Sequence, residues 1–509
     1  MKFLITGGRP LHGEIALAGA KNAVSKVMVA SLLTDEPCVL KNVPKIGEVE
    51  IIQELLETIG SKVELFGSTA RIHTPKIENS RVLQLTRRNR IPILALGPLL
   101  ARAGEAEVPV LGGDRIGARP VDIHLEALAK LGAQLQITKT SYHAWAKDGL
   151  RGANIELRFP SVGATENAIL AAVLAQGKTI IRNAASEPEI IDLIKMLQNM
   201  GAIIELSPPR TITIEGVRRL RGVTHRILPD RNEAVSFACL ALATRGKVLV
   251  KGAVQDHLIT FLNVVRRMGA EYEVGDEGIT FWLPNGAMRP VSITTDVHPG
   301  FMTDWQQPLA VCMAQADDVS AIHETIYEDR FGYASDLNEM GAVMKVGTDC
   351  PDGEKCRFAE RGFNHYATIT GGAPLHAANL KTRDLRSGML DIIAALAAEG
   401  RSEIDGVDEI DRGYERIDER LRALGADIER VKLSKNAGPR PRRPCAGRGY
   451  YCAMTILEII TIVILAVLLV GTWLLNLHLD EFAELFEKFL MIAVAVSAFF
   501  LFFLLRRWW

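Results

Sequence analysis

The feature that most limits how this chain can fold is a joint between a helix and a strand that recurs six times. Each copy has an apolar residue at the end of a helical segment, then Gly and a small residue, then an alternating strand. A glycine at this point can adopt a positive φ and end the helix. The copies are IGSKVEL from Ile59, LGAQLQI from Leu131, MGAIIEL from Met200, MGAEYEV from Met268, MGAVMKV from Met340 and LGADIERV from Leu424. Their spacing, roughly 70 residues, exceeds a solenoid unit and predicts an α/β module used six times.

The size, charge and cysteine spacing of the chain limit the number of domains and the kinds of ligand that we expect. Its 509 residues are too many for one ordinary core, so we expect about two to three domains. Two groups of three modules would form two similar domains around one cleft. The formal net charge of −1 argues against binding nucleic acid, which requires clustered excess Lys and Arg. The seven cysteines include no CxxC pair, so neither a zinc site nor a disulfide framework is indicated, and Cys350 and Cys356 are expected to be loop thiols.

The two ends of the chain differ sharply. The N-terminus has too short an apolar run for a signal peptide, so we expect the main part of the chain in the cytoplasm. Residues 432–453 are rich in Pro, Gly, Arg and Lys and predict a flexible basic linker. Within 454–509, two apolar runs at 456–475 and 489–505 have lengths suited to crossing a bilayer.

Charges around these runs predict their topology. Lys and Arg flank the outer ends, and acidic residues occupy the turn, so the positive-inside rule predicts a membrane hairpin with both ends cytoplasmic. This hairpin would tether the rest of the chain to the inner face of the cell membrane. Alternatively, Met454 begins a separate small membrane protein joined here by fusion or a reading error, and the sequence leaves both possibilities open.

Two segments have the pattern of anion sites. Lys21 and Asn22 stand at the start of an apolar helix, where a cation and an amide add to the free backbone N–H groups. An exposed lysine at a helix start is the simpler interpretation of that position alone. Ser161, Val162 and Gly163 enter another helix, and backbone donors beside the glycine could approach a pyrophosphate closely.

Acidic and basic residues elsewhere also suggest chemistry. Asp304 precedes an apolar helix and is either an N-cap or a carboxylate able to accept a hydroxyl proton. Asp114 lies in a glycine-rich loop, where its simplest interpretation is a turn residue. Arg119 lies in the same loop, and its planar guanidinium can bind a phosphate or carboxylate through two parallel hydrogen bonds. Four further arginines are spread over different repeats, and only the fold can bring them to one cleft: Arg90, Arg231, Arg330 and Arg386.

Taken together, the ordered motifs resemble the enolpyruvyl transferase family, and specifically its members that act on UDP-N-acetylglucosamine. The resemblance runs from Met1 to about Val431. The motifs are GAKNA, ALGPLLAR, GGxxIGARPVDIH, SVGATEN, EPEIID, LPDR, HPGFMTDWQ, ETIYEDRF, DLRSG and IDRGYERIDERLRALGA. The resemblance implies two inside-out α/β domains built from six similar repeats. One would combine residues 1–19 with 230–431, and the other would span 20–229.

The resemblance also implies a reaction and a set of site residues. The enolpyruvyl group of phosphoenolpyruvate would pass to the 3′-hydroxyl of UDP-N-acetylglucosamine with release of phosphate, in peptidoglycan synthesis. Lys21, Asn22, Arg119 and Arg386 would contact phosphoenolpyruvate. The sugar nucleotide would be lined by Arg90, Arg119, Pro120, Val121, Asp122, Ile123, Ser161, Val162, Gly163, Asp304 and Ile326. Asp304 would be the base, Asp114 the acid, and no metal or cofactor would be needed.

The chain departs from the family pattern at two positions. Asp114 stands where many members have a reactive cysteine, so the resemblance implies retained activity together with resistance to fosfomycin, which alkylates that cysteine. A carboxylic acid can serve as a proton donor if burial and substrate charge raise its pKa, provided that Arg115 points outward. Phe159 stands where some relatives have a lysine near the nucleotide, which puts one phosphate contact in doubt.

Two other functions fit parts of the sequence. A membrane-tethered protein that binds a cell-wall precursor without catalysis would account for the tail, although it gives no chemical reason to keep Lys21, Asp304 and Arg386. A 3-phosphoshikimate enolpyruvyl transferase would share the architecture but would be expected to show different lysine and arginine motifs. Activity with each acceptor separates these alternatives.

Overall fold

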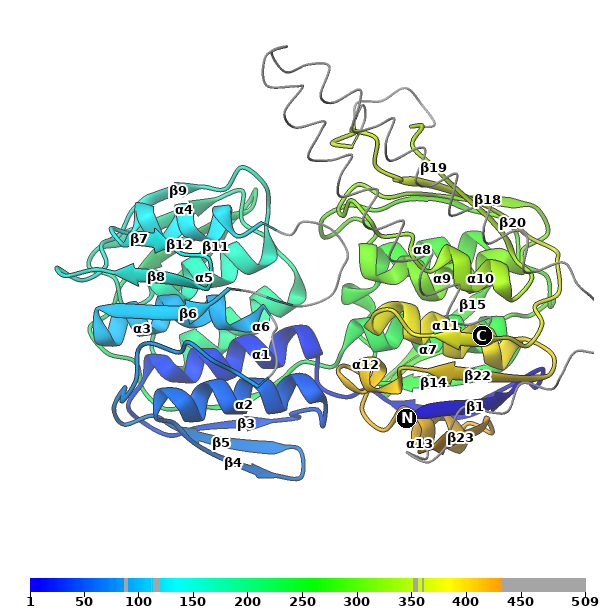
Figure 1. Ribbon diagram of the computed structural model, residues 1–509, viewed down its shortest axis with the longest axis horizontal. Coiled ribbons are helices and arrows are strands. Elements are labelled where there is room, and N and C mark those ends of the chain that lie inside the picture. Colours follow the sequence, from blue (N-terminus) through cyan, green and yellow to red (C-terminus); the bar gives the residue numbers. More distant parts are fainter. Residues whose placement is uncertain (87–89, 111, 113–119, 351–355, 359–360, 433–509) are drawn as a thin grey trace, which may run out of the picture. The chain divides into compact units, whose positions relative to one another are not determined.

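A computed structural model describes residues 1–86, 90–110, 112, 120–350, 356–358 and 361–432 of this chain (Figure 1). The chain divides into two compact units, Met1–Leu433 and Ser434–Trp509. The second unit, which includes both expected membrane spans at 456–475 and 489–505, lies outside the described residues. In the part that is described, no helix combines the length and the apolar composition that a bilayer crossing requires.

The strands of the described residues form six separate sheets, one for each expected module. Three of them are ordered β13 (Thr224–Arg226), β3 (Cys38–Lys41), β5 (Thr69–His73), β4 (Lys62–Phe66); β6 (Glu105–Pro109), β8 (Ser141–Trp145), β7 (Gln134–Ile137); and β11 (Ile203–Ser207), β12 (Thr211–Glu215), β10 (Lys178–Arg182), β9 (Asn154–Glu156). The other three are β15 (Glu271–Gly275), β16 (Gly278–Trp282), β14 (Lys247–Lys251), β2 (His12–Ala16); β17 (Ser292–Thr294), β18 (Val319–His323), β20 (Tyr366–Thr370), β19 (Val343–Gly347); and β21 (Asn379–Lys381), β22 (Arg401–Asp405), β1 (Lys2–Thr6), β23 (Asp427–Val431).

The six expected helix–glycine–strand joints are confirmed, and each feeds an edge strand of a different sheet. The helices that precede these strands are α2 (Gly47–Ile59), α4 (Asp122–Lys130), α6 (Pro188–Asn199), α8 (Ile259–Arg267), α10 (Ala334–Glu339) and α13 (Ile417–Ala423). The glycines that end them, with φ between 93° and 115°, are Gly60, Gly132, Gly201, Gly269, Gly341 and Gly425. A side chain at such a φ is strained, which is why glycine recurs at this point.

A second set of six helices supplies the interior of the modules. They are α1 (Lys21–Ala30), α3 (Leu96–Ala103), α5 (Val162–Ala172), α7 (Arg231–Ala243), α9 (Gln306–Ala314) and α11 (Leu385–Ala397). Every residue of α7 and α9 is buried, and most of their side chains are apolar, as expected for helices in the interior. The helices α7, α9 and α11 pack pairwise against one another, so helices occupy the centre and the sheets lie outside them (Figure 1).

Buried apolar side chains form two clusters. One contains residues between 3 and 15 together with residues between 234 and 428, and the other contains residues between 20 and 227. The chain therefore leaves the first cluster after β2 and returns to it at α7. These two crossings run side by side, because Ala20 N donates to Leu228 O at 2.8 Å and Asp230 N donates to Ala18 O at 2.9 Å. We propose that these clusters are the cores of two domains with boundaries at 19/20 and 229/230.

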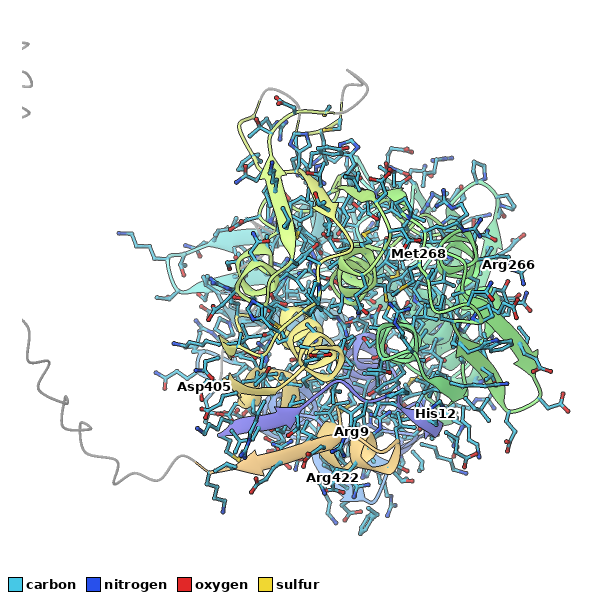
Figure 2. All side chains as sticks on the ribbon, turned by 90° about the vertical axis from the view of Figure 1, so that its right-hand side faces the viewer. Arg9, His12, Arg266, Met268, Asp405 and Arg422 are labelled. Atoms are coloured by element: carbon cyan, nitrogen blue, oxygen red, sulfur yellow. The ribbon has the colours of Figure 1, made fainter. Side chains whose placement is uncertain are left out.

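The N-terminal strand closes the first cluster. It lies between β22 and β23 and is antiparallel to both, with Lys2 opposite Asp405 and Val431. Figure 2 shows the blue β1 beside the orange β23, with Asp405 of β22 at the same end. Residues from the two ends of the compact unit thus share one sheet.

Candidate functional site

A cavity of about 740 Å³ lies where the six inner helices begin. Its wall includes Lys21 and Asn22 of α1, Val162 and Gly163 of α5, Arg231 of α7, and Leu385 and Arg386 of α11. The short helices η2 (Ile91–Ala95) and η4 (Thr303–Trp305), which lead into α3 and α9, contribute Ile91 and Asp304. Free N–H groups and helix dipoles favour anions at such ends. The arrangement therefore makes the cavity suited to a ligand with several negative charges.

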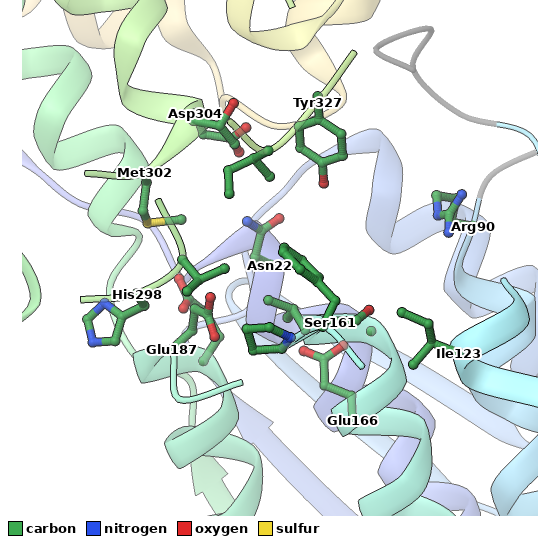
Figure 3. Close-up of a pocket in the computed structure, with 18 of the residues that line it drawn as sticks. Asn22, Arg90, Ile123, Ser161, Glu166, Glu187, His298, Met302, Asp304 and Tyr327 are labelled. Carbon is green, nitrogen blue, oxygen red and sulfur yellow. The ribbon is translucent and has the colours of Figure 1, made fainter. Parts of the chain in front are cut away.

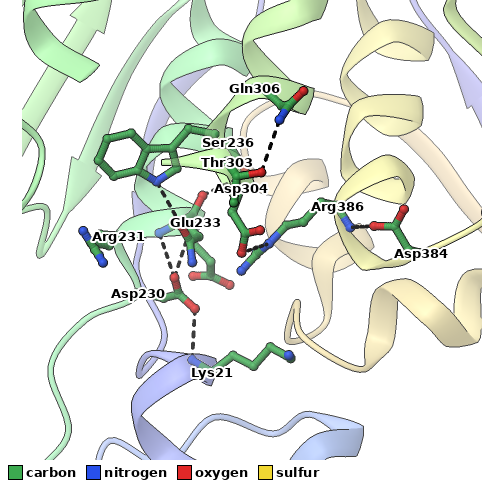
Figure 4. Close-up of polar contacts among 12 residues, drawn as sticks. Lys21, Asp230, Arg231, Glu233, Ser236, Thr303, Asp304, Gln306, Asp384 and Arg386 are labelled. Carbon is green, nitrogen blue, oxygen red and sulfur yellow. Dashed lines mark hydrogen bonds and ion pairs between the residues drawn. The ribbon is translucent and has the colours of Figure 1, made fainter. Parts of the chain in front are cut away.

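One buried carboxylate joins two of these helix starts. Asp230 is the N-cap of α7 and accepts hydrogen bonds from Asn232 N at 2.8 Å and Glu233 N at 3.3 Å. Its other oxygen accepts a bond from Lys21 N, the first residue of α1, at 3.0 Å (Figure 4). The backbone of Lys21 is thereby fixed, while its side chain reaches the cavity. Asp230 thus connects the start of α1, whose apolar residues belong to one core cluster, with the start of α7, whose apolar residues belong to the other.

Asp304 lies between two buried arginines. Its Oδ1 accepts a bond from Arg330 Nη2 at 2.6 Å. Its Oδ2 accepts one from Arg386 Nε at 3.2 Å (Figure 4). Burial alone would raise the pKa of Asp304, but the charges of Arg386, Arg330 and Lys21 outweigh it and hold the pKa at about 2. The carboxylate is therefore ionised at neutral pH, and its side chain is 20% exposed to the cavity.

The backbone around Asp304 decides between the two interpretations of this residue. Asp304 lies inside η4, and neither η4 nor α9 has a side-chain cap. The interpretation of Asp304 as an N-cap is therefore wrong, and its carboxylate is committed to the two arginines instead.

Arg386 is held at its backbone by the cap of its own helix and at its guanidinium by Tyr414. Asp384 caps α11 and forms a capping box with Ser387, accepting a bond from Arg386 N at 2.9 Å. The side chain of Arg386 donates through Nη1 to Tyr414 Oη at 3.0 Å, and Tyr414 Oη is 2.8 Å from Ser236 Oγ on α7. This chain of contacts orients the Arg386 fork toward Asp304 and the cavity.

The opposite wall is formed by α5 and its surroundings. Ser161 caps α5 and accepts a bond from Ala164 N at 3.4 Å, so the helix begins at Val162. Glu166, one turn further along, is completely buried, and its nearest cation is Lys26 Nζ at 3.9 Å. Burial raises the pKa of Glu166 to about 8, with Lys26 opposing the rise. Figure 3 shows Glu166 and Ser161 across the cavity from Asp304.

A second buried ion pair borders the cavity from α7 and α6. Arg231 donates through Nε and Nη2 to the two carboxylate oxygens of Glu189 at 2.9 and 2.8 Å. Burial opposes ionisation of Glu189, but the charge of Arg231 outweighs it and lowers the pKa of Glu189. Arg231 also lies 3.3 Å from Nδ1 of His298, whose pKa burial and Arg231 lower to about 4. The imidazole of His298 is therefore neutral at physiological pH.

The structure brings most of the residues singled out from the sequence to this one cavity. Its lining includes Lys21, Asn22, Arg90, Pro120, Ile123, Ser161, Val162, Gly163, Asp304, Ile326 and Arg386, together with Arg231 and Arg330. Val121 and Asp122 are not part of the lining. Val121 packs against the second core cluster, and Asp122 forms an ion pair with Arg158. Asp114, Arg115 and Arg119 lie outside the described residues.

Several lining residues were not anticipated. Glu166 stands in the SVGATEN motif already quoted, one helical turn after Gly163, so its spacing was available as a signal. Lys26 follows Asn22 by four residues on α1, and its Nζ donates to Asn22 O at 2.6 Å. Arg357 approaches from a distant loop, with its guanidinium 5.2 Å from the ring centre of Phe159. No pattern within one segment could predict this contact between residues that are distant in the sequence.

Comparisons with known proteins agree with this architecture. A family model described as EPSP synthase (3-phosphoshikimate 1-carboxyvinyltransferase) matches residues 5–421. The fold is similar to that of the enolpyruvyl transferase NikO from Streptomyces tendae, at 23% identity and a TM-score of 0.73, covering 84% of this chain and 98% of that one. It is also similar to EPSP synthase from Acinetobacter baumannii, at 17% identity and a TM-score of 0.62, covering 84% and 100%. The fold and the family model thus define an enolpyruvyl transferase.

Curated relatives narrow the assignment within that class. The chain is 45% identical to the UDP-N-acetylglucosamine 1-carboxyvinyltransferase of Protochlamydia amoebophila (strain UWE25), over 86% of this chain and 96% of the relative. It is 46% identical to the enzyme of the same name from Chlamydia pneumoniae, over 82% and 93%. The chain belongs to the UDP-N-acetylglucosamine 1-carboxyvinyltransferase family.

Proposed function

We propose that this chain transfers the enolpyruvyl group of phosphoenolpyruvate to the 3′-hydroxyl of UDP-N-acetylglucosamine and releases phosphate, in peptidoglycan synthesis. The observation that carries the proposal is the ionised Asp304, held between Arg330 and Arg386 at the edge of a cavity where six helices begin. Phosphoenolpyruvate has a carboxylate and a phosphate, and the acceptor has a pyrophosphate. Cations and helix starts at one site suit this combination of charges.

The two substrates occupy different walls of the cavity in this proposal. Lys21, Asn22 and Arg386 hold phosphoenolpyruvate beside Asp304, together with Arg119 of the glycine-rich loop. The sugar nucleotide lies along the wall that includes Arg90, Pro120, Ile123, Ile326 and the start of α5 from Ser161 to Gly163. The backbone N–H of Ile326 donates to Glu324 Oε1 at 2.6 Å, which fixes this part of the wall. Val121 and Asp122 act through the position of α4 rather than by contact.

The charge balance of the site gives Asp304 its role. With a pKa of about 2, Asp304 is a poor base while both arginines bind it. The carboxylate and phosphate of phosphoenolpyruvate compete for Arg386 and Lys21, which frees Asp304 and raises its pKa. Asp304 then accepts the proton of the 3′-hydroxyl as that oxygen bonds to C2 of phosphoenolpyruvate. Asp114 protonates the methylene carbon. The resulting methyl group then returns that proton to Asp114 as phosphate leaves with the proton that Asp304 accepted.

The test is phosphate release by the full chain, given phosphoenolpyruvate with either UDP-N-acetylglucosamine or shikimate 3-phosphate. We expect release with the sugar nucleotide only. Asp304→Asn is expected to lower kcat by about 10²–10⁴-fold, the usual contribution of a general base, while the nucleotide still binds. Release only with shikimate 3-phosphate would replace the acceptor. A folded chain that binds the nucleotide and releases phosphate with neither would favour a non-catalytic binding protein.

We also propose that the reaction takes place in the cytoplasm, with the 456–475 and 489–505 runs as a tether to the inner face of the membrane. What supports the tether is the sequence alone: two apolar runs of spanning length with basic outer flanks. Nothing in those runs resembles a substrate site, so the chemistry is assigned to the first compact unit.

A further inference from the structure

Four side chains with metal-ligating atoms converge beside the β18–β20 edge, outside the cavity. They are His323 at the end of β18, Cys350 and Cys356 in the connection between β19 and β20, and His365 immediately before β20. One potential ligand atom from each lies within 4.8 Å of all the others. The sulfur of Cys350 is 3.3 Å from that of Cys356, 3.0 Å from Nε2 of His365 and 3.9 Å from Nε2 of His323.

These separations fit a tetrahedral ion of the size of zinc. With Zn–S bonds of about 2.3 Å and Zn–N bonds of about 2.0–2.1 Å, the ligand atoms of a tetrahedral site lie roughly 3.3–3.8 Å apart. The three separations from Cys350 fall around this interval, and the remaining pairs lie within 4.8 Å, so the ligand atoms would have to move by up to about 1 Å to close on one ion. Two sulfurs and two imidazoles are also the donor set of many structural zinc sites, although their usual Cys spacing is two to four residues rather than the five found here.

The surroundings of His365 prepare it as a ligand. Its side chain is buried, and Nδ1 lies 2.8 Å from the carbonyl oxygen of Phe363. Because a carbonyl can only accept, Nδ1 must carry the proton, which leaves the lone pair of Nε2 directed at Cys350. A hydrogen bond from the second ring nitrogen to a carbonyl is the usual support of a metal-bound histidine. The buried ring of Phe358, centred 6.1 Å from the ring of His365, limits access of water on that side.

We propose that His323, Cys350, Cys356 and His365 form a structural zinc site. Four protein ligands complete the tetrahedron, so the ion would hold no open position for a substrate. It would fasten the connection between β19 and β20 to the end of β18. A bound metal adds order to a connection whose sequence offers few apolar side chains for packing.

The site has a consequence for the cavity nearby. Arg357 directly follows the ligand Cys356, and its Nη1 donates to Ile326 O at 3.3 Å. Its Nη2 pairs with Glu328 at 3.6 Å, and its guanidinium lies over the rings of Phe358 and Phe159. Zinc at Cys356 would therefore hold a cation beside Phe159, which lines the cavity next to the wall that we assign to the sugar nucleotide. This consequence rests on the proposed function, whereas the zinc site does not.

The test is the zinc content of the full chain, measured by mass spectrometry after extensive dialysis against buffer without metal. We expect one zinc per chain, and none in the Cys350→Ser/Cys356→Ser double variant. Replacement of zinc by Co²⁺ is expected to give the absorption bands of tetrahedral cobalt with thiolate ligands. His365→Gln should change this spectrum and release the metal to a chelator faster. The matched control is Cys445→Ser/Cys452→Ser, which removes two cysteines outside the cluster and should keep the zinc.

Other results would overturn the site. A wild-type chain that binds neither Zn²⁺ nor Co²⁺ at micromolar concentration excludes it. If Cys350 and Cys356 form a disulfide in the isolated chain, and the chain still binds no zinc after that disulfide is reduced, the pair is a redox couple instead. Retention of stoichiometric zinc in the Cys350→Ser/Cys356→Ser variant would place the metal elsewhere. Because these readouts do not use catalysis, they are independent of whether the enolpyruvyl transfer is confirmed.

Discussion

Replacement of Glu166 by Gln should stabilise the protein, and increasingly so as the pH rises. Glu166 is completely buried in α5, and neither of its carboxylate oxygens has a hydrogen-bond partner among the described residues. Lys26, at 3.9 Å, is too far to form a close ion pair. Burial therefore dominates and raises the pKa of Glu166 from 4.5 to about 8, with the charges of Glu189 and Glu187 adding to the rise.

The size and sign of the effect follow from the two pKa values. Each pH unit between the unfolded and folded pKa corresponds to about 1.4 kcal/mol, so the interval from 4.5 to about 8 amounts to about 5 kcal/mol. Because the folded pKa is raised, the native state keeps its full stability below pH 4.5 and loses it as the pH rises through about 8. A glutamine has no proton to lose. The variant should match the wild type near pH 5 and exceed it most at pH 9.

The assay is the melting temperature of the full chain between pH 5 and pH 9. A compact unit of 433 residues has an unfolding entropy of about 0.9 kcal/mol/K, so 1 kcal/mol corresponds to about 1 °C. We expect the variant to melt about 5 °C above the wild type at pH 9 and at the same temperature at pH 5. Glu205→Gln, on an exposed position of β11, is the matched control and should give no pH-dependent difference. A constant difference across this pH range would refute the reasoning.

Three other perturbations test separate parts of the molecule. Arg231→Met leaves the Glu189 carboxylate buried without its partner, and we expect a loss of about 3–5 kcal/mol in stability, measured by chemical denaturation. Adding Glu189→Gln to that variant should recover part of the loss. Asp114→Cys should make phosphate release sensitive to fosfomycin, whereas ordinary sensitivity of the wild type would contradict the role given to Asp114. Finally, the full chain should sediment with membranes and a chain ending at Leu433 should not; equal distribution would argue against the 456–475 and 489–505 hairpin.

The sequence predicted the repeated architecture because its signal is local. Each helix–glycine–strand joint is a short run whose glycine must take a positive φ, so six such runs can be recognised without knowing how they pack. Local patterns also placed Lys21 and Ser161 at helix starts. The division into domains was predicted from the resemblance, and the two core clusters are the structural basis on which we propose it.

The rest of the site depends on contacts between distant segments. Asp304 looked like a helix cap from its neighbours, and only the approach of Arg330 and Arg386, 26 and 82 residues away, gives it another role. The resemblance alone placed Val121 and Asp122 in the site, but their side chains turn to the core and to Arg158.

The metal-ligand cluster was missed for the same reason. His323 comes from a different strand, and the five residues between Cys350 and Cys356 do not match a short zinc-binding motif. A pattern within one segment cannot reveal ligands that three segments share.

The position of β1 has a consequence for how the protein is made. Among the strands of the described residues, β1 pairs with β22 and β23 alone, so residues 2–6 must wait for residues 401–431 to be synthesised. At about 5–20 residues per second, this wait lasts on the order of 20–80 s. The segment from 20 to 227 has its own buried cluster and can fold during that interval, while residues 2–6 stay without their partner strands. A ribosome that stops shortly before Asp427 would release a chain in which residues 20–227 can fold but β1 lacks its partner β23. An unpaired strand edge of this kind can pair with other chains and cause aggregation.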